Sequence, residues 1–167
     1  IMEGLQDSEL PSSKMKLSHL YDLSRKINLI PSLYLEAGAI HGTVLCKDNI
    51  PLVYMEDVGR HNAVDKVAGW MFENDNFGGD KILYTTGRLT SEMVIKTALM
   101  EIPILVSRSG FTAWGVELAN DLGMTLIGRL RGKRFLCLSG KERLVWDIET
   151  ANSENIDETD NAGSKLA

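Results

Sequence analysis

The chain has 167 residues, of which 44% are hydrophobic and 25% are charged, as expected for one folded domain with a sizeable core. No apolar stretch approaches the roughly 20 residues of a membrane helix and no secretory signal is visible, so we expect a cytoplasmic protein without membrane contact. The formal net charge of −5 gives no reason to expect a nucleic-acid partner.

The acidic residues are concentrated at the two ends of the chain. Residues 149–167 carry five acids and one base, and residues 1–13 carry three acids and no base, which leaves a net charge of +2 for residues 14–148. We therefore expect a linker over 1–13, one folded domain over 14–148 and a disordered acidic tail over 149–167. A slightly positive body is compatible with an anionic ligand.

Hydrophobic spacing and turn residues predict alternating helices and strands along this body. The predicted elements are a helix over 14–29, strands over 41–47 and 51–55, a helix over 62–72, a strand over 81–85, a helix over 91–100, a strand over 104–107, a helix over 112–122, and strands over 125–127 and 135–138. Ser91 and Thr112 are good N-cap residues for two of these helices. This order predicts an α/β fold with α-β-α layers and a mostly parallel sheet.

Three successive strand-to-helix junctions combine a glycine, an arginine and a small polar residue. They are residues 57–62 (DVGRHN), 85–91 (TTGRLTS) and 107–112 (SRSGFT). If the strands are parallel, all three junctions lie at the edge where ligands of open α/β sheets bind. Free N–H groups at helix N-termini and arginine side chains both suit phosphate. An ordinary loop with a solvated arginine is the alternative for each junction.

Residues 128–134 (GRLRGKR) place four cations within six residues around a glycine. Such a segment is either a second phosphate-binding element or a solvated basic turn before the last strand. His41 and His61 are further candidates, because a histidine can transfer protons or contact a ligand, although each can equally serve as a hydrogen-bonded structural residue.

Cys46 and Cys137 lie in apolar, strand-like runs, so we expect both to be buried and reduced. Their separation fits neither a metal site nor a redox pair. The sequence also lacks the ligand set of a zinc deaminase, a Walker loop, a dinucleotide-binding glycine motif and a serine nucleophile motif. No metal site is expected.

Residues 57–66 (DVGRHNAVDK) resemble the signature of the formate dehydrogenase accessory proteins, the FdhD family. The resemblance continues through residues 87–96 (GRLTSEMVIK), 106–119 and 125–128, and extends over roughly 35–146. It implies a fold like that of cytidine deaminases without their zinc chemistry. It also implies a sulfurtransferase that forms a homodimer.

The same resemblance implies a substrate and partners. A cysteine desulfurase supplies sulfur, a cysteine carries it as a persulfide, and the sulfur passes to a molybdenum (or tungsten) bis(molybdopterin guanine dinucleotide) cofactor that enters formate dehydrogenase. The cofactor is thus a bound substrate. The persulfide cysteine of the family lies in a Cys-x-x-Cys loop, which this sequence lacks, so the catalytic cysteine is expected upstream of this chain and no catalytic residue within it.

Carried over by position, the cofactor-binding segment of the family falls on the basic residues singled out above. Its members here are Arg129, Leu130, Arg131, Gly132, Lys133 and Arg134. Arg60, His61, Arg88 and Ser91 match signature positions and are expected to line the same pocket, with His41 as a further binding residue. The histidine motif departs from the family pattern, because Ala37-Gly38-Ala39 stands where a threonine and two glycines are usual.

Two other functions stay open from the sequence. One is a chaperone that binds the cofactor without transferring sulfur. The other is a nucleotide-processing enzyme of deaminase-like fold.

Overall fold

The computed structural model describes residues 4–5, 9–31 and 38–148. The acidic tail predicted over 149–167 lies outside the described residues, as do Ala37 and parts of the predicted linker. Within the described ranges, no helix is long and apolar enough to cross a membrane.

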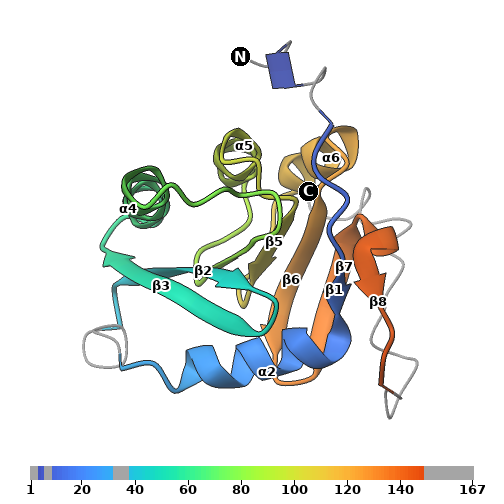
Figure 1. Ribbon diagram of the computed structural model, residues 1–167, viewed down its shortest axis with the longest axis horizontal. Helices are drawn as coiled ribbons and strands as arrows, with labels where there is room; N and C mark the ends of the chain where they lie inside the picture. The colour runs from blue at the N-terminus through green and yellow to red at the C-terminus, as the bar shows by residue number, and fades with distance from the viewer. Residues whose placement is uncertain (1–3, 6–8, 32–37, 149–167) are drawn as a thin grey trace, which may run out of the picture.

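A six-stranded sheet forms the middle layer of the molecule (Figure 1). Its spatial order is β3 (Ile50–Asp57), β2 (His41–Lys47), β4 (Ile82–Thr85), β5 (Ile104–Ser107), β6 (Thr125–Arg131) and β7 (Arg134–Ser139). β4, β5 and β6 pair in parallel, whereas β2 is antiparallel to both β3 and β4, and β7 is antiparallel to β6. Four of the six strands, β3 to β6, therefore run in one direction.

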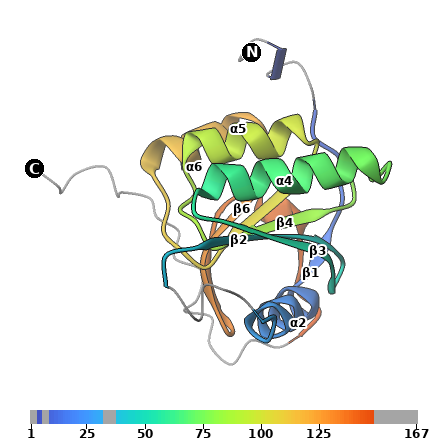
Figure 2. The same ribbon diagram turned by 90° about the vertical axis from the view of Figure 1, so that its left-hand side faces the viewer.

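Helices cover both faces of this sheet (Figure 2). α4 (Arg60–Glu73), α5 (Ser91–Leu99) and α6 (Ala113–Asp121) lie on one face, and α2 (Leu17–Asn28) lies on the other. Alternate strand residues enter the two cores: Leu83 and Leu105 belong to the core under the three helices, whereas Tyr84 and Val106 belong to the core over α2. The predicted α/β class with α-β-α layers is confirmed.

Several helix and strand boundaries near the candidate site differ from the predicted ones. α4 begins at Arg60, so Arg60 and His61 lie in the first helical turn and not in a loop. β6 and β7 extend to Arg131 and Arg134, which face each other across the hairpin. The basic segment is therefore the end of a β-hairpin and not a loop before the last strand. Charged residues concealed these strand ends, because most side chains of the hairpin are exposed and give no hydrophobic pattern.

A second, two-stranded sheet was not predicted from the sequence. β1 (Met15–Lys16) pairs in parallel with β8 (Leu144–Val145), which follows the short 3₁₀ helix η1 (Lys141–Arg143). Arg143 is buried and donates from Nε and Nη2 to the carbonyl oxygen of Pro11, at 3.2 and 3.0 Å, and from Nη1 to that of Gly123 at 2.5 Å. These bonds attach the chain before β1 to the body.

α6 lies unusually close to the loop that follows β4, and Gly115 permits this approach. A Cβ atom at Gly115 would lie 2.6 Å from the carbonyl oxygen of Leu89, which is itself bonded to the N–H of Thr112. A backbone oxygen held in this way cannot move aside as a flexible side chain can. Because residue 115 is a glycine, α6 can approach the loop after β4 this closely.

We expect Gly115→Ala to lower the free energy of unfolding by about 1–3 kcal/mol, the usual cost of overpacking. Gly69→Ala is the matched control, because Gly69 lies inside α4 with no atom within 4 Å of its added Cβ. Ala at that position should stabilise the helix by roughly 0.5–1 kcal/mol. Urea unfolding followed by circular dichroism measures both, and effects of the same sign would contradict the packing argument.

Candidate functional site

The three strand-to-helix junctions lie at one edge of the sheet, as the sequence predicted. β3, β4 and β5 share one direction, so their carboxyl ends meet there. His41 begins β2 at the same edge, opposite Asp57 in the ladder. The β6–β7 hairpin closes the other side, because β6 also ends at this edge. We call this region the binding edge.

Backbone hydrogen bonds connect the loops of the binding edge into one row. Two of these bonds join a strand to the loop after a neighbouring strand, and two join the loops after β4 and β5 to each other, over 2.9–3.1 Å. The bonds run from Thr86 N to Gly42 O, from Leu89 N to Gly110 O, from Thr112 N to Leu89 O, and from Arg129 N to Ser109 O. The loops therefore form a continuous surface whose backbone positions are fixed.

Buried hydroxyl groups at the strand ends shape these turns. Thr85 Oγ1 accepts a bond from the N–H of Gly87 at 3.0 Å. Ser107 Oγ donates to the carbonyl oxygen of Gly87 at 2.6 Å and accepts from the N–H of Ser109 at 2.9 Å. Both hydroxyl side chains are fully buried. These bonds replace ladder partners that the backbone loses where each strand ends.

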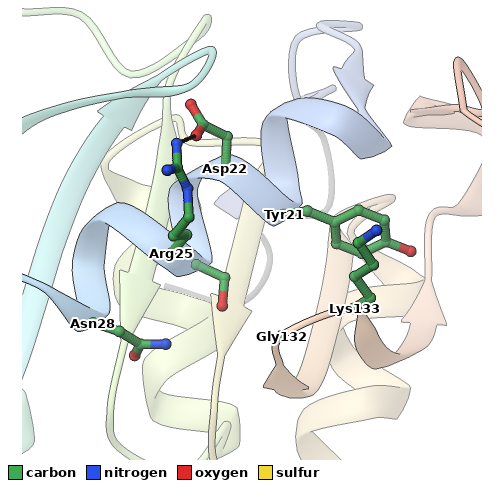
Figure 3. Close-up of a pocket in the computed structure, with 7 residues that line it drawn as sticks. Tyr21, Asp22, Arg25, Asn28, Gly132 and Lys133 are labelled. Carbon is green, nitrogen blue, oxygen red and sulfur yellow. Dashed lines mark hydrogen bonds and ion pairs between the residues drawn. The ribbon is translucent and has the colours of Figure 1, made fainter.

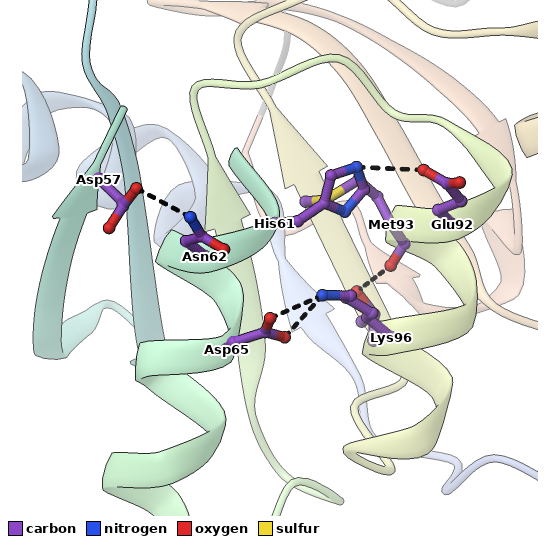
Figure 4. Close-up of polar contacts among 8 residues, drawn as sticks. Asp57, His61, Asn62, Asp65, Glu92, Met93 and Lys96 are labelled. Carbon is purple, nitrogen blue, oxygen red and sulfur yellow. Dashed lines mark hydrogen bonds and ion pairs between the residues drawn. The ribbon is translucent and has the colours of Figure 1, made fainter. Parts of the chain in front are cut away.

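Asp57 organises the first junction (Figure 4). Its Oδ1 accepts from the N–H of Gly59 at 3.0 Å and from Asn62 Nδ2 at 3.2 Å, and its Oδ2 lies 2.8 Å from Lys66 Nζ. The lysine bond, followed by the Gly59 and Asn62 bonds, lowers the pKa of Asp57 to about 2. The carboxylate stays ionised at neutral pH and holds the turn that leads into Arg60.

Arg60 provides the strongest indication of a ligand. Its Nε atom is buried and has no hydrogen-bond partner among the described residues. The side chain passes over Gly87, where an added Cβ atom would lie 3.0 Å from both Cβ and Cδ of Arg60. A buried donor without a partner costs about 1–3 kcal/mol. That cost is removed if an oxyanion or a water molecule accepts the bond.

His61 and Ser91 lie at the adjoining ends of α4 and α5. His61 Nε2 is 3.1 Å from Glu92 Oε2, and behind this pair Lys96 Nζ contacts both oxygens of Asp65, at 2.7 and 2.8 Å (Figure 4). The two helices are thus connected by polar contacts near the binding edge.

The predicted N-cap of α5 was one residue too late. The cap is Thr90, whose Oγ1 accepts from the N–H of Met93, and Ser91 is the first helical residue. Thr112 is confirmed as the N-cap of α6. A threonine next to a serine offers two suitable caps, and only the backbone path after Leu89 selects between them.

The basic hairpin, Arg129–Arg134, contains two residues of positive φ: Arg129, at 53°, lies at an irregularity of β6, and Gly132, at 60°, lies in the turn. The guanidinium carbon of Arg129 lies 5.8 Å from the centre of the Phe111 ring, so the hairpin is in contact with the third junction. Leu130 is buried in the core and is unavailable to a ligand. The other members are exposed, and none of its four cations has an acidic partner among the described residues.

A pocket of about 490 Å³ lies between the tip of this hairpin and α2 (Figure 3). Its lining residues are Tyr21, Asp22, Ser24, Arg25, Asn28, Gly132 and Lys133. Its one carboxylate, Asp22, lies 2.6 Å from Arg25 and 2.7 Å from Lys26, and these bonds strongly lower its pKa. The pocket therefore presents more positive than negative charge.

The predicted site residues fall into two neighbouring groups. Gly132 and Lys133 line the pocket with α2, whereas Arg60, His61, Arg88, Ser91 and His41 lie along the binding edge outside its lining. The residues of α2 were missed by sequence analysis. Polar residues on the outer side of an amphipathic helix look solvated in sequence, and only the position of the hairpin encloses them.

Both cysteines are unsuited to carry sulfur. Cys46 is fully buried and Cys137 nearly so, which confirms the prediction that both are free and in the core. Burial raises the pKa of Cys46 to about 12 and that of Cys137 to about 11. The described residues also contain no cluster of three or more His, Cys, Asp or Glu side chains able to hold a metal ion.

Comparison with known proteins gives consistent matches. A family model described as the FdhD/NarQ family matches residues 1–145. The chain is 31% identical over 132 residues to a sulfur carrier protein FdhD from Listeria innocua serovar 6a, and 33% identical over 135 residues to one from Staphylococcus aureus strain MRSA252. These alignments cover 79% and 80% of this chain and 51% of each relative, so the chain spans about half their length.

A solved structure has the same fold. The crystal structure of a protein from Desulfotalea psychrophila, described as a formate dehydrogenase accessory protein, matches with a TM-score of 0.79 and 34% identity. The match covers 87% of this chain and 63% of that chain.

The cysteine environment predicts low thiol reactivity. With pKa values near 12 and 11, Cys46 and Cys137 carry almost no thiolate at pH 8, and thiolate is the reactive form. We expect the native chain to react with Ellman's reagent at least about a hundredfold more slowly than the same chain in guanidinium chloride. Rapid reaction of either thiol in the native chain would show that the cores open readily.

Proposed function

Because the chain belongs to the FdhD/NarQ family, we propose that it is the cofactor-binding part of a sulfur carrier protein that prepares the cofactor of formate dehydrogenase. The substrate it binds is the molybdenum or tungsten bis(molybdopterin guanine dinucleotide) cofactor. The complete protein passes sulfur to that cofactor from a cysteine desulfurase. It works as a homodimer in the cytoplasm.

This proposal rests on the positive charge without acidic partners, among the described residues, along the binding edge. Arg60 Nε lacks a partner there, and the cations of the basic hairpin lack acidic partners among the described residues. The helix N-termini of α4, α5 and α6 open toward the same edge. Arginine side chains and free helical N–H groups together favour a ligand with several phosphates.

The pocket beside the hairpin suits the nucleoside part of such a ligand. Its volume of about 490 Å³ lies within the usual range for small-molecule sites, roughly 300–1,000 Å³. Tyr21 offers an aromatic ring and Asn28 an amide that can donate and accept bonds to a base. The diphosphate would then lie against the hairpin, next to Lys133 and Arg131.

The sulfur chemistry requires a cysteine from elsewhere. Cys46 and Cys137 are buried and hold their protons at neutral pH, whereas a persulfide carrier needs an accessible thiolate. We place the persulfide on a cysteine upstream of this chain, as in the Cys-x-x-Cys loop of the family. The burial of both thiols also favours a second candidate function, a cofactor chaperone that transfers no sulfur.

The test is calorimetric titration with guanosine diphosphate, and with adenosine diphosphate for comparison. We expect the chain to bind the guanosine form more tightly. Arg131→Ala combined with Arg134→Ala should weaken that binding at least about tenfold, because a charge-assisted contact to phosphate contributes about 1.5–3 kcal/mol.

A matched control removes the same charge at the opposite edge of the sheet. Lys47 ends β2 and Lys141 follows β7, so Lys47→Ala with Lys141→Ala leaves the binding edge unchanged. If both double variants lose the same affinity for guanosine diphosphate, the loss is explained by overall charge and not by the hairpin. Full affinity in the Arg131 and Arg134 variant would exclude the hairpin from the site.

A further inference from the structure

Three large apolar side chains are exposed at the ends of α4 and α5 that lie farthest from the binding edge. Phe72 lies in the last turn of α4, Phe77 follows that helix, and Leu99 is the last residue of α5. Their exposed fractions are 86%, 79% and 59%. A single exposed apolar side chain is common on a protein surface, whereas several together mark a site of interaction.

Phe72 and Leu99 lie on the facing sides of two neighbouring helices. α4 and α5 run side by side on one face of the sheet (Figure 2), and Asp65 of α4 contacts Lys96 of α5 at 2.7 Å. Phe72 is seven residues beyond Asp65, which is about two helical turns, and Leu99 is three residues beyond Lys96, about one turn. Residues at these spacings share one side of a helix, so both apolar side chains lie beyond the same polar contact.

The loop after α4 brings Phe77 to the end of α5. Gly78 packs so closely there that an added Cβ atom would lie 2.0 Å from the carbonyl oxygen of Met100. Met100 is the C-cap of α5 and directly follows Leu99. Because Phe77 precedes Gly78, it lies beside the same helix end. We call Phe72, Phe77 and Leu99 the distal patch.

Acidic residues surround the distal patch. Glu73, Asp75 and Glu101 are exposed at the ends of the same two helices, and none of them forms an ion pair with another described residue. Lys81, the next cation along the chain after α4, is already paired with Asp80. The C-terminal ends of α4 and α5 add the negative ends of two helix dipoles. The patch is therefore apolar with negatively charged surroundings.

Two of these acids lie at positions that lower stability. Asp75 and Glu101 have φ of 49° and 59°, in the left-handed region that favours glycine, and α6 has Gly123, at 66°, in the equivalent turn. A carboxylate at the C-terminal end of a helix is also repelled by the helix dipole. Cations from outside the described part of the chain would remove the electrostatic share of this cost.

We propose that the distal patch binds an amphipathic helix of a partner protein, with apolar side chains on one face and lysine or arginine residues beside them. A helix that lays its apolar face on such a surface is a common mode of recognition, and its cations would meet the three acids. A second copy of the same patch fits poorly, because a two-fold contact would bring the acids of both copies together.

The position of the patch makes this interaction independent of the proposed cofactor site. α4 and α5 begin at the binding edge, with Arg60 and Ser91, and the patch lies at their other ends. A partner helix and an anionic ligand can therefore occupy the protein together. The proposal does not require that the ligand be the cofactor proposed above.

The interaction is tested on the full chain with a synthetic peptide of roughly 15 residues, long enough to form a helix, that has leucine on one face and lysine on the other. We expect it to bind in calorimetry and to shift the amide NMR signals of residues 70–77 and 96–101. A peptide with glutamate in place of every lysine should not bind.

Two variants separate the apolar and charged parts of the patch. F72S/L99S should weaken binding of the leucine–lysine peptide at least about tenfold, because exposed apolar area that binding would bury is removed. This variant keeps the net charge, so the loss cannot come from overall electrostatics. E73Q/D75N/E101Q should weaken binding in 50 mM salt but not in 500 mM salt, where charges are screened.

The matched control is L29S/V58S, which replaces side chains that are each 76% exposed and lie outside the patch. It should bind the peptide like the unmodified chain. No binding, full affinity in F72S/L99S, or equal binding of the glutamate peptide would overturn the proposal. A dimer that sedimentation detects in the unmodified chain and not in F72S/L99S would assign the patch to a second copy and overturn it too.

The nucleotide titration separates failure of this proposal from failure of the proposed function. F72S/L99S should bind guanosine diphosphate like the unmodified chain, because both positions lie away from the binding edge. Peptide binding without nucleotide binding would retain the distal patch and reject the nucleotide site. Nucleotide binding without peptide binding would do the reverse.

Discussion

The close contact between the loops after β4 and β5 fixes the geometry of the whole binding edge. Leu89 bonds to Gly110 and Thr112 through the backbone, and Gly115 lets α6 approach the carbonyl oxygen of Leu89. The row continues to β2 on one side, through Thr86, and to the basic hairpin on the other, through Ser109. Because backbone bonds connect these loops to one another and to the neighbouring strands, the cations along the edge extend from a fixed backbone.

The folded body has a small net charge but a local concentration of positive charge at the hairpin. The net charge of residues 14–148 is only +2, yet the paired ions, such as Lys66 with Asp57 and Lys96 with Asp65, largely cancel one another. The four cations of the hairpin, in contrast, have no acidic partner among the described residues. Charge patterning along the chain, rather than total charge, therefore determines where an anion is attracted.

Burial in one core gives both cysteines a structural role. Cys46 and Cys137 lie in the core over α2, where burial keeps both protonated. This chain, which matches about half the length of its curated relatives, thus has no reactive thiol in its described part.

Hydrophobic periodicity predicted the strands β2, β4 and β5 and the helices α4 to α6, because each buries one face or both faces in a core. It failed where side chains are mostly exposed or an element is very short: β6 and β7 continue into the charged hairpin, and β1 and β8 are two residues each. The sequence also could not decide between two adjacent N-cap residues of α5, Thr90 and Ser91.

For the site, the sequence by itself determined which cations and glycines are available and that three junctions recur at strand ends. Only the tertiary structure decided that α2 faces the hairpin to form a pocket, that Arg60 Nε is buried without a partner among the described residues, and that Leu130 is withdrawn into the core. The physical reason is that junction chemistry is local in sequence. Pockets and burial depend instead on strand direction and on which distant elements pack together, which no single segment encodes.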